Sequence, residues 1–514
     1  MASEYGIKYA VHLINNHFGD LVSRVCECLL RRGPLTVEEV EQFVGLKTEK
    51  VQNSLLVLIQ HNCVQAFLQE ITGDVTVDGL SARTVTKYIA VFNHIIHRSR
   101  FEKFLAIVKQ EFDQQCYYLM EGLFQHGRLS LEQLRARCGQ LSEAKDADAT
   151  LENLKKLASS RYVERCPKSE PSVDPPQDEE EPPKKKRIPS KSNEAATAFE
   201  TLEQRAVAAS MSIDAVRFCV LTDDIVDVEG RNLGEKRKHD EITSEVDHGE
   251  IEEKTVLWRP NFEEFIFQLR NKACIEVVRK RMDDQAVFVF TAMIEASKHG
   301  EKQLNTKKSV PLSLDSIYEE TIRSERGRNM TIDLVKTTLV ELCSPFGFIR
   351  MEDELCFIDF KRIIESAQTD EVESIVNKRY GNDAYKMFRF LSKTRCLTET
   401  DKISDTAFVE KKEATKYLFK MWQDGYLHME KVVAGAQFLL WKINWSSILC
   451  QALDEMFHAA LNLSLRSKHE KEQIQEGMPV HNKNNLRRVQ LLLYSSLVML
   501  DDAIMLFHDL KLLG

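Results

Sequence analysis

The stretch LIQHNCVQ, residues 58–65, ends an apolar segment at a His-Asn pair and then continues with alternating side chains. Asn suits the end of a helix because it tolerates the left-handed backbone conformation there. Three other segments end in a similar way, namely SSRYVER (159–165), SPFGFIR (344–350) and QDGYLHM (423–429). The four endings predict one recurring joint, in which a helix stops and a β-strand begins.

The segments that lead to these endings also share a beginning. Each starts with Leu followed by Ser or Thr, a pair that predicts a hydrophobic staple and a helix cap. The four pairs are Leu35-Thr36, Leu129-Ser130, Leu312-Ser313 and Leu397-Thr398. Glu39 and Gln133 stand three residues after the first two hydroxyls and complete a capping box. We therefore expect a short helix, a turn and a longer helix with apolar residues at period 3.6 in each segment.

Two alternating strands follow the third and fourth endings, in GFIRMEDELCFIDF (347–360) and YLHMEKVVAGAQFLLWKI (426–443). Helices followed by a β-hairpin make a winged helix, a variant of the helix-turn-helix. Any one segment fits an irregular helical domain about as well, whereas the shared caps, breaks and strands of all four favour winged helices. We predict a mainly α fold with small β wings, built from four tandem winged-helix modules.

The predicted modules are separated by a linker and followed by a C-terminal antiparallel coiled-coil hairpin. The boundaries are winged helix 1 at 1–92, winged helix 2 at 93–166, the linker at 167–255, winged helix 3 at 256–370, winged helix 4 at 371–444 and the hairpin at 445–514. The linker begins with a segment rich in Pro and charge (167–196), which predicts that it is mostly disordered. Its weakly apolar piece at 211–228 is expected to dock on a partner or on a neighbouring module.

The last predicted helix carries apolar residues at alternating spacings of four and three, which is typical of a coiled-coil seam. The seam residues are Leu493, Leu497, Leu500, Ile504 and Phe507. A second row lies beside them, with Leu492, Met499, Leu506 and Leu513. Two interpretations stay open, since this face can pack on the preceding helix of the same chain or present a surface to a partner protein.

Composition and motifs argue against catalysis. None of the 12 cysteines forms a CxxC pair, which disfavours zinc ribbons, and no apolar run reaches 18 residues, so we expect no membrane span. The sequence contains no P-loop, GxGxxG, GxSxG or HExxH. His94 and His97 share a helical turn but have no third ligand nearby, so we interpret them as surface or core imidazoles. We predict no catalytic residues, no metal and no cofactor.

Cations that can contact a nucleic acid are few, and the formal net charge of −9 opposes DNA binding. The candidates for DNA or phosphate contact are Lys47, Lys50, Lys155, Lys156, Arg279, Lys280 and Arg281. Protein docking with occasional, non-sequence-specific phosphate contacts fits this charge better than reading of a DNA sequence. A separate cluster in the linker, flanked by prolines, is a candidate nuclear import signal, although it also fits an ordinary solvated charge run. It consists of Lys184, Lys185, Lys186 and Arg187.

Several stretches resemble one family, the large winged-helix subunit of the heterotrimer specific to RNA polymerase III, itself related to the alpha subunit of transcription factor IIE. The most specific stretches are HFGDLV (17–22), LIQHNCV (58–64), RYVERCP (161–167) and YLFKMWQDGYLHM (417–429). The resemblance covers nearly the whole chain, including the tandem units and the terminal hairpin. It identifies the chain as similar to the third-largest subunit of the polymerase.

This resemblance implies a nuclear, non-catalytic subunit without a cofactor, seated on the clamp side of the polymerase. Its implied partners are the two smaller heterotrimer subunits, the clamp and promoter DNA, and no membrane. The implied role is to help recruit the polymerase and open DNA for transcription of tRNA, 5S rRNA and other small RNAs. Two other classes remain as alternatives, a free-standing winged-helix DNA-binding regulator and a cullin-like winged-helix scaffold.

Overall fold

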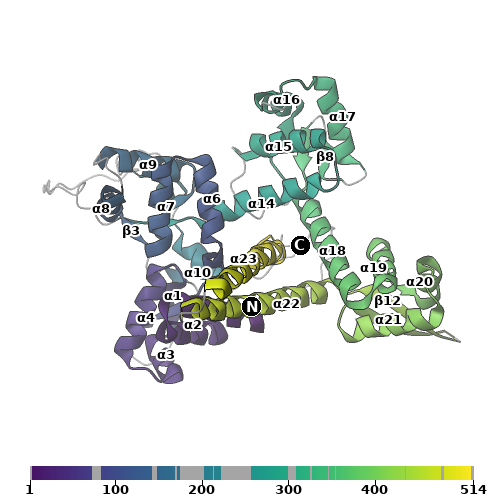
Figure 1. Ribbon diagram of the computed structural model, residues 1–514, viewed down its shortest axis with the longest axis horizontal. Coiled ribbons are helices and arrows are strands. Elements are labelled where there is room, and N and C mark those ends of the chain that lie inside the picture. The colour runs from purple at the N-terminus through teal and green to yellow at the C-terminus, as the bar shows by residue number, and fades with distance from the viewer. Residues whose placement is uncertain are drawn as a thin grey trace, which may run out of the picture. The chain divides into compact units, whose positions relative to one another are not determined.

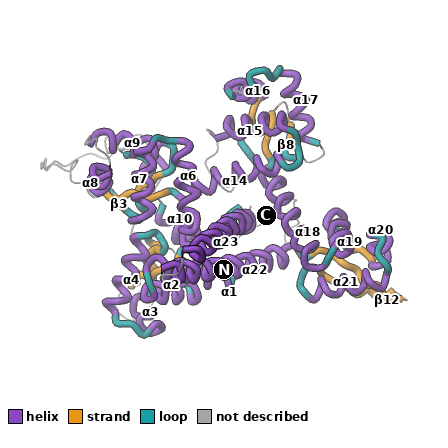
Figure 2. The backbone as a smooth tube through the Cα atoms, in the orientation of Figure 1, coloured by secondary structure: helices purple, strands orange, loops and turns teal. Residues whose placement is uncertain are grey.

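The computed structural model divides the chain into two compact units, one of residues 10–265 and one that joins residues 3–9 to residues 266–514. Helices dominate both units and the strands form short sheets (Figures 1 and 2), which agrees with the predicted mainly α class. The structure describes residues 3–71, 83–141, 147–167, 171–173, 202–211, 214–220, 256–298, 308–324, 327–344, 347–352, 355–434, 436–475 and 480–510.

Four three-stranded sheets, each with its own helices, form the described part of the chain. We call them sheet regions 1 to 4 in chain order. Region 1 follows α1 (Glu4–Phe18) and contains α2 (Asp20–Arg32), α3 (Val37–Val44), α4 (Thr48–Gln60), β1 (Val64–Ile71) and β2 (Arg83–Ala90). β1 and β2 pair antiparallel, and β5 (Ser172–Val173) adds in parallel to the other edge of β1.

Region 2 lies in the same unit and is built largely from helices. Its elements are α5 (Phe92–His97), η1 (Arg98–Arg100), α6 (Phe101–Glu111), α7 (Gln114–His126), β3 (Leu129–Ser130), α8 (Leu131–Leu141), α9 (Ala147–Ser159), β4 (Val163–Arg165) and β6 (Leu257–Pro260). The strand order is β3-β6-β4. Two short helices of the predicted linker, α10 (Leu202–Ser210) and α11 (Asp214–Arg217), also belong to this unit.

The other unit holds regions 3 and 4 and the C-terminal helices. Region 3 contains α14 (Phe262–Arg279), α15 (Asp284–Lys298), β7 (Leu312–Ser313), α16 (Leu314–Arg323), α17 (Ile332–Cys343), β8 (Ile349–Glu352) and β9 (Leu355–Ile358). Region 4 contains α18 (Phe360–Tyr380), α19 (Asn382–Thr394), β10 (Thr398–Glu399), α20 (Thr400–Ala407), α21 (Lys411–Gln423), β11 (Leu427–Ala434) and β12 (Ala436–Ile443). The chain then forms α22 (Trp445–Gln475) and α23 (Val480–His508), which pack side by side.

The helix caps were predicted correctly at three of the four positions. Thr36 and Glu39 form the expected capping box, and Ser130 and Gln133 exchange the same two bonds. Ser313 caps α16 through the backbone N–H of Ser316. The prediction for Thr398 is wrong, because α20 begins one residue later than expected and the Thr398 hydroxyl donates to the carbonyl of Cys396 instead. Glu399 occupies the cap of α20 without a side-chain bond.

The predicted joint recurs in all four regions. In each region a residue with positive φ lies between the end of the helix and the strand that follows it, and these residues are Asn62 (58°), Arg161 (63°), Gly347 (64°) and Gly425 (78°). In region 2 the left-handed residue is therefore Arg161 and not Ser159 or Ser160, where the break was expected. The next carbonyl accepts a bond from the residue that precedes the following helix. The four bonds are Val91 N to Cys63 O (2.9 Å), Asn261 N to Tyr162 O (2.9 Å), Asp359 N to Phe348 O (2.9 Å) and Asn444 N to Tyr426 O (3.1 Å).

One predicted boundary is wrong. We assigned residues from 256 onward to the third module, but β6 (Leu257–Pro260) pairs with β3 and β4 and so completes the sheet of region 2. The predicted linker therefore lies between the two hairpin strands of region 2 and not between two modules. Local sequence hides this arrangement, because a four-residue strand far along the chain from its partner carries no pairing signal of its own.

Candidate protein-docking surfaces

Three of the four helices that enter the joints, α4, α17 and α21, present a large apolar side chain to solvent. In α4, Val51, Leu55 and Leu58 are buried, whereas Leu56 on the other face is 63% exposed. In α17, Val340 is 58% exposed, and in α21, Trp422 is 39% exposed. These are the helices that enter the major groove in DNA-reading members of the helix-turn-helix class. In this chain the exposed faces of these three helices carry apolar side chains that can pack against another protein.

Few of the cations predicted to contact DNA are free to do so. Lys47 and Lys50 lie exposed at the start of α4. In α9, Lys155 is half-buried, and the ammonium of Lys156 lies 3.9 Å from the carboxylate of Asp113 and 3.6 Å from that of Glu152. The start of α4 is therefore the more accessible of these two predicted sites.

The predicted basic cluster at 279–281 is largely used within the protein. Arg279 pairs with Glu276 on its own helix, and Arg281 pairs with Asp370 of α18 while its guanidinium lies 5.9 Å from the centre of the Phe348 ring. Lys280 is exposed, and no carboxylate of the described residues pairs with it. Lys280 is therefore the one cation of the predicted patch that no carboxylate of the described residues neutralises.

The five predicted seam residues of α23 are all at least half-buried. Ile504 and Phe507 are buried, at 2% and 3% exposure, and Leu493, Leu497 and Leu500 are half-buried. The start of α22 and the end of α23 also contact other elements. The Tyr5 ring stacks on His458 at 4.0 Å between centroids, and Gln368 donates to the carbonyl of Leu506 at 2.9 Å.

The second row on α23 is exposed at Leu492 and Met499, whereas Leu506 is half-buried. Leu492 is 62% exposed and Met499 is 72% exposed, while Leu491 beside them is 68% exposed. Leu513, the last residue of the predicted row, lies outside the described residues. A groove of about 430 Å³ runs between α22 and α23 at this level. It is lined by Asn462, Leu463, Arg466, Val489, Leu492, Leu493 and Ser496.

The same helix is long and apolar enough to cross a membrane. Residues 484–508 contain a window with a mean hydropathy of 1.5, although we expected no such span. A single helix of this kind is weak support for a membrane span, since core helices of soluble proteins also qualify. The hydropathy comes from two apolar rows, of which the seam row is covered by α22.

Sequence reasoning missed a buried charge network that ties the linker to region 2. Glu164 of β4 is 3% exposed and receives bonds from Arg259 Nε of β6 at 2.7 Å and from Arg217 Nε of α11. Arg217 also donates to Glu263 at 3.1 Å. These partners lie far apart in the sequence, so only the alternation of charge and apolar residues in RYVERCP hints that one of its charges faces inward.

The linker also packs against region 1. Ala206 of α10 is fully buried in a cluster with Leu202 of the same helix and with Phe67 and Ile89 of the sheet. The Glu203 carboxylate accepts a bond from the backbone N–H of Phe92 at 3.2 Å, at the start of α5. The linker residues 202–220 that the structure describes thus contact both regions of this unit.

The corner that ends α4 is where regions 1 and 2 meet. The Asn62 side chain accepts a bond from Arg128 Nε at 2.9 Å, and its carbonyl lies 2.9 Å from His94 Nδ1. The backbone N–H of Arg128 donates to the carbonyl of Gln60 at 3.1 Å. Gly127 has φ 81° and sits so close to α4 that a Cβ atom there would lie 2.0 Å from the Gln60 oxygen. The opening stretch of sequence therefore forms an interdomain joint as well as a helix end.

Burial at this corner and in the neighbouring core of region 2 disfavours the charged forms of titratable side chains. Desolvation, with smaller effects of Arg259 and His97, lowers the pKa of His94 to about 3. Desolvation also raises the pKa of the Cys63 thiol to about 11 and that of Cys116 to about 12. These thiols therefore stay protonated and unreactive near neutral pH.

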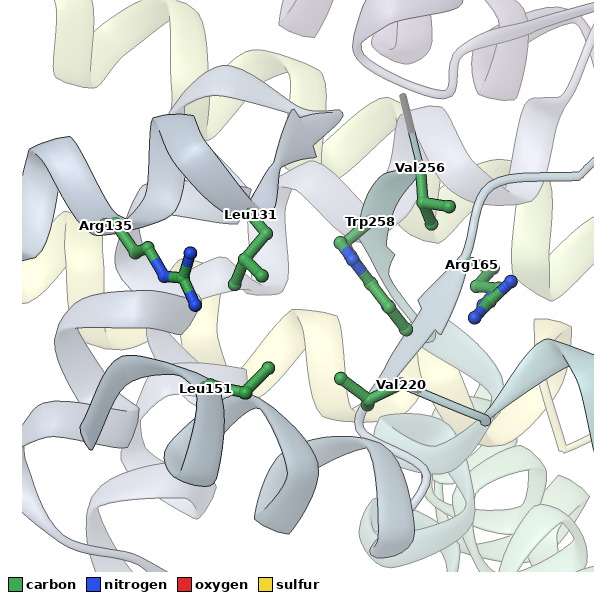
Figure 3. Close-up of a pocket in the computed structure, with 7 residues that line it drawn as sticks. All are labelled: Leu131, Arg135, Leu151, Arg165, Val220, Val256 and Trp258. Atoms are coloured by element: carbon green, nitrogen blue, oxygen red, sulfur yellow. The ribbon is translucent and has the colours of Figure 1, made fainter. Parts of the chain in front are cut away.

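The described residues contain no group of three or more His, Cys, Asp or Glu side chains placed to hold a metal ion. A cavity of about 70 Å³ in region 2 is lined by Leu131, Arg135, Leu151, Arg165, Val220, Val256 and Trp258 (Figure 3). Figure 3 shows Arg135 and Arg165 on opposite sides of the Trp258 ring, and no nucleophile or acid is among the lining residues.

Comparisons with known proteins agree on one family. The model of the RNA polymerase III subunit RPC82 helix-turn-helix domain matches residues 8–69, that of RNA polymerase III subunit RPC82 matches 152–367, and that of the POLR3C C-terminal winged-helix domain matches 372–440. DNA-directed RNA polymerase III subunit rpc3 of Dictyostelium discoideum is 22% identical, with 91% of this chain and 92% of that protein covered. Subunit RPC3 of Homo sapiens is 21% identical, with 90% and 84% covered. The chain belongs to the RPC82/RPC3 family of winged-helix subunits of DNA-directed RNA polymerase III.

Proposed function

We propose that this chain is a non-catalytic subunit that scaffolds the initiation heterotrimer on the polymerase clamp. In this role it binds the two smaller heterotrimer subunits and assists promoter recruitment and DNA opening for transcription of tRNA, 5S rRNA and other small RNAs. The four sheet regions act as four tandem winged-helix modules, and α22 and α23 act as the coiled-coil hairpin. The recurring left-handed joint and return bond support this division into modules.

The observation that carries the proposal is the character of the outer faces of α4, α17 and α21. A helix that reads DNA needs cations for phosphates and polar groups for base edges. These helices also expose Leu56, Val340 and Trp422, and exposed apolar side chains of this kind favour protein contacts. The modules therefore serve mainly as docking units for protein partners.

Contact with promoter DNA in this proposal is local and non-sequence-specific. Lys47, Lys50 and Lys280 are the exposed cations at the predicted positions that have no ion pair among the described residues. So few phosphate contacts predict a shallow salt dependence, because each neutralised phosphate adds about 0.9 to the slope of log affinity against log salt. A free-standing regulator would bind one promoter sequence at nanomolar concentration with a steep slope.

Affinity purification of the tagged full chain from nuclei tests the proposal. Recovery of RNA polymerase III subunits, including the two smaller heterotrimer subunits, is the expected result. Recovery of ubiquitin ligase components instead would favour the cullin-like scaffold. Tight binding of a single DNA sequence by the purified chain, without polymerase recovery, would favour the free-standing regulator.

We further propose a nuclear location that depends on the basic cluster at 184–187, which lies outside the described residues. Replacement of Lys184, Lys185, Lys186 and Arg187 with Ala is expected to raise the cytoplasmic fraction of a fluorescently tagged chain. The matched control replaces Lys236, Arg237 and Lys238 with Ala. An unchanged distribution for the first variant would count against the import signal.

A further inference from the structure

The C-terminal hairpin has a buried part and an exposed part. Near the start of α22 and the end of α23, Phe457 and Ile504 are 1% and 2% exposed and contribute to the packed interior. Toward the turn between the helices, residues 461–473 of α22 and 484–500 of α23 are mostly exposed or half-buried. We call these two segments the free half of the hairpin.

The apolar side chains of the free half follow a repeat that a further helix can match. Leu492 and Met499 lie seven residues apart, which places them on one side of α23, and Leu491 adjoins them. Leu465 on α22 is 47% exposed. The groove of about 430 Å³ between the two helices lies at the same level and is lined on both sides by leucines or valine. A third helix laid in such a groove makes the knobs-into-holes contacts of a three-helix coiled coil.

The charge around this groove is positive, unlike that of the whole chain. The charged side chains of the free half are five cations and two carboxylates, namely Arg466, Lys468, Lys471, Arg487, Arg488, Glu470 and Glu472. The Arg466 guanidinium lies 3.2 Å from the Glu470 carboxylate, and Arg487 and Arg488 are exposed beside Leu491 and Leu492. An occupant with acidic flanks gains from this field, whereas a second copy of the same hairpin would meet like charge.

We propose that the free half of the hairpin docks an amphipathic helix with acidic flanks, contributed by another protein subunit. The helix lies along the groove between α22 and α23, its apolar side chains contact Leu492 and Met499, and its carboxylates face Arg487 and Arg488. This inference deepens the proposed function and rests on it for the source of the helix, which is another subunit of the polymerase. It also explains why a helix of an assembled protein keeps an apolar row that its own chain leaves uncovered.

Photocrosslinking in the assembled complex tests the inference. A full chain carrying p-benzoylphenylalanine at position 499 is purified with its partners from nuclei, irradiated, and mapped by mass spectrometry. The expected product joins position 499 to a helical segment of another subunit with alternating apolar and acidic residues. The same label at position 21, where an exposed leucine lies outside the surfaces described above, is the control and is expected to give no such product.

Surface variants of the full chain supply the second readout. L492E/M499E and R487E/R488E are each expected to lower recovery of the crosslinked subunit by about tenfold or more, as loss of a central hydrophobic or charged contact does at protein interfaces. L21E is the matched control and is expected to recover it at the wild-type level. Circular dichroism and the melting temperature of each variant verify that the hairpin is still folded.

Each other result overturns the inference. These are a product that joins two copies of this chain, sedimentation with phosphatidylcholine–phosphatidylserine vesicles that L492E/M499E abolishes, a crosslink to a basic segment, or no product in a complex that contains the polymerase. A wild-type chain that recovers no polymerase subunits overturns the proposed function instead. In that case the crosslink from position 499 is mapped in the complex that the chain does form. A product with an acidic amphipathic helix supports the docking inference, and any other product refutes it.

Discussion

Replacement of Glu164 with Ala should destabilise region 2 more than any single change to its cationic partners. The carboxylate is 3% exposed, and it is shared by two guanidinium groups that are themselves largely buried, Arg259 at 6% and Arg217 at 12% exposure. Arg259 comes from β6 and Arg217 from α11, so one carboxylate holds the middle of the inserted linker and the strand that follows it against β4. Its removal leaves buried Arg259 without its carboxylate and leaves Arg217 with exposed Glu263 alone.

The magnitude follows from which charges are left unpaired. Breaking a buried ion pair by removing one partner costs about 3–5 kcal/mol, and this is the range expected for E164A. R217A leaves Glu164 paired with Arg259, so its cost should be that of lost charge-assisted hydrogen bonds, about 1–3 kcal/mol. Glu263, which also contacts Arg217, is 60% exposed, and E263A should cost about 1 kcal/mol or less. E263A is therefore the matched control.

Hydrogen exchange followed by mass spectrometry on the full chain measures these costs where they arise. The amides of β4 and β6 exchange through opening of region 2, and a loss of about 1.4 kcal/mol speeds their exchange tenfold. E164A is expected to accelerate it by about 100-fold or more, with R217A intermediate and E263A near the wild type. The double variant E164A/R217A should lose less free energy of unfolding than the sum of the two single losses, because the two residues act as a pair.

Two outcomes would refute this reasoning. If E164A exchanges like the wild type, Glu164 does not hold the network together. If E263A accelerates exchange as much as E164A does, the exposed pair and not the buried one stabilises α11. Full additivity of E164A and R217A would show that the two side chains contribute independently of each other.

Three further perturbations probe the corner between regions 1 and 2, each by urea denaturation of the full chain. N62G keeps the left-handed backbone and loses only the bond to Arg128, at a cost of about 1–3 kcal/mol. N62A loses the same bond and adds backbone strain of about 1–2 kcal/mol. Equal costs for the two variants would contradict the role of the positive φ at this position. G127A should destabilise by at least about 2 kcal/mol more than G45A, since both positions have positive φ but only the first meets the last carbonyl of α4. The folded pKa of His94 is about 3, below the ordinary 6.5, so the unfolded state binds more protons as pH falls. The free energy of unfolding should therefore drop below pH 6.5 by up to about 1.4 kcal/mol per pH unit. H94N should flatten this slope.

The parts of the fold that depend on neighbouring residues could be predicted from the sequence. Thr36, Ser130 and Ser313 cap helices through bonds to residues three positions away, and Gly347 and Gly425 tolerate the left-handed conformation without strain. These are local effects, so the residues that produce them stand next to the structures they determine. Repetition of the same local signals made the joints recognisable.

The parts that depend on distant partners could not be predicted. Arg281 looks like a free cation in the sequence, but Asp370 of α18 pairs with it. Glu164 looks like an ordinary strand charge, whereas arginines from two later segments surround it. A linear pattern gives the chemical type of a side chain, and only the fold decides which other side chain neutralises it.

The hairpin illustrates the same limit for apolar residues. Ile504 and Phe507, which the 4–3 spacing predicted as seam residues, are buried, and their role in a coiled-coil seam stays a prediction. The row that contains Leu492 and Met499 is just as apolar, but α22 covers one side of α23 and leaves this row exposed. The two interpretations that were open for this helix therefore apply to different faces of it.

The recurring joint explains how a linker can be inserted into a module without unfolding it. In each region, the carbonyl after the left-handed residue bonds to the residue before the next helix, so the two ends of the hairpin are fixed to each other independently of what connects its strands. Lengthening such a connection is tolerated because the entropy cost of closing a loop rises only slowly with length. In region 2 the insertion then returns as α10 and α11, which contact regions 1 and 2, and Arg217 supplies a counter-ion that buried Glu164 needs. The described linker residues 202–211 and 214–220 are therefore part of the folded unit, and they add a structural tie to the hairpin of region 2.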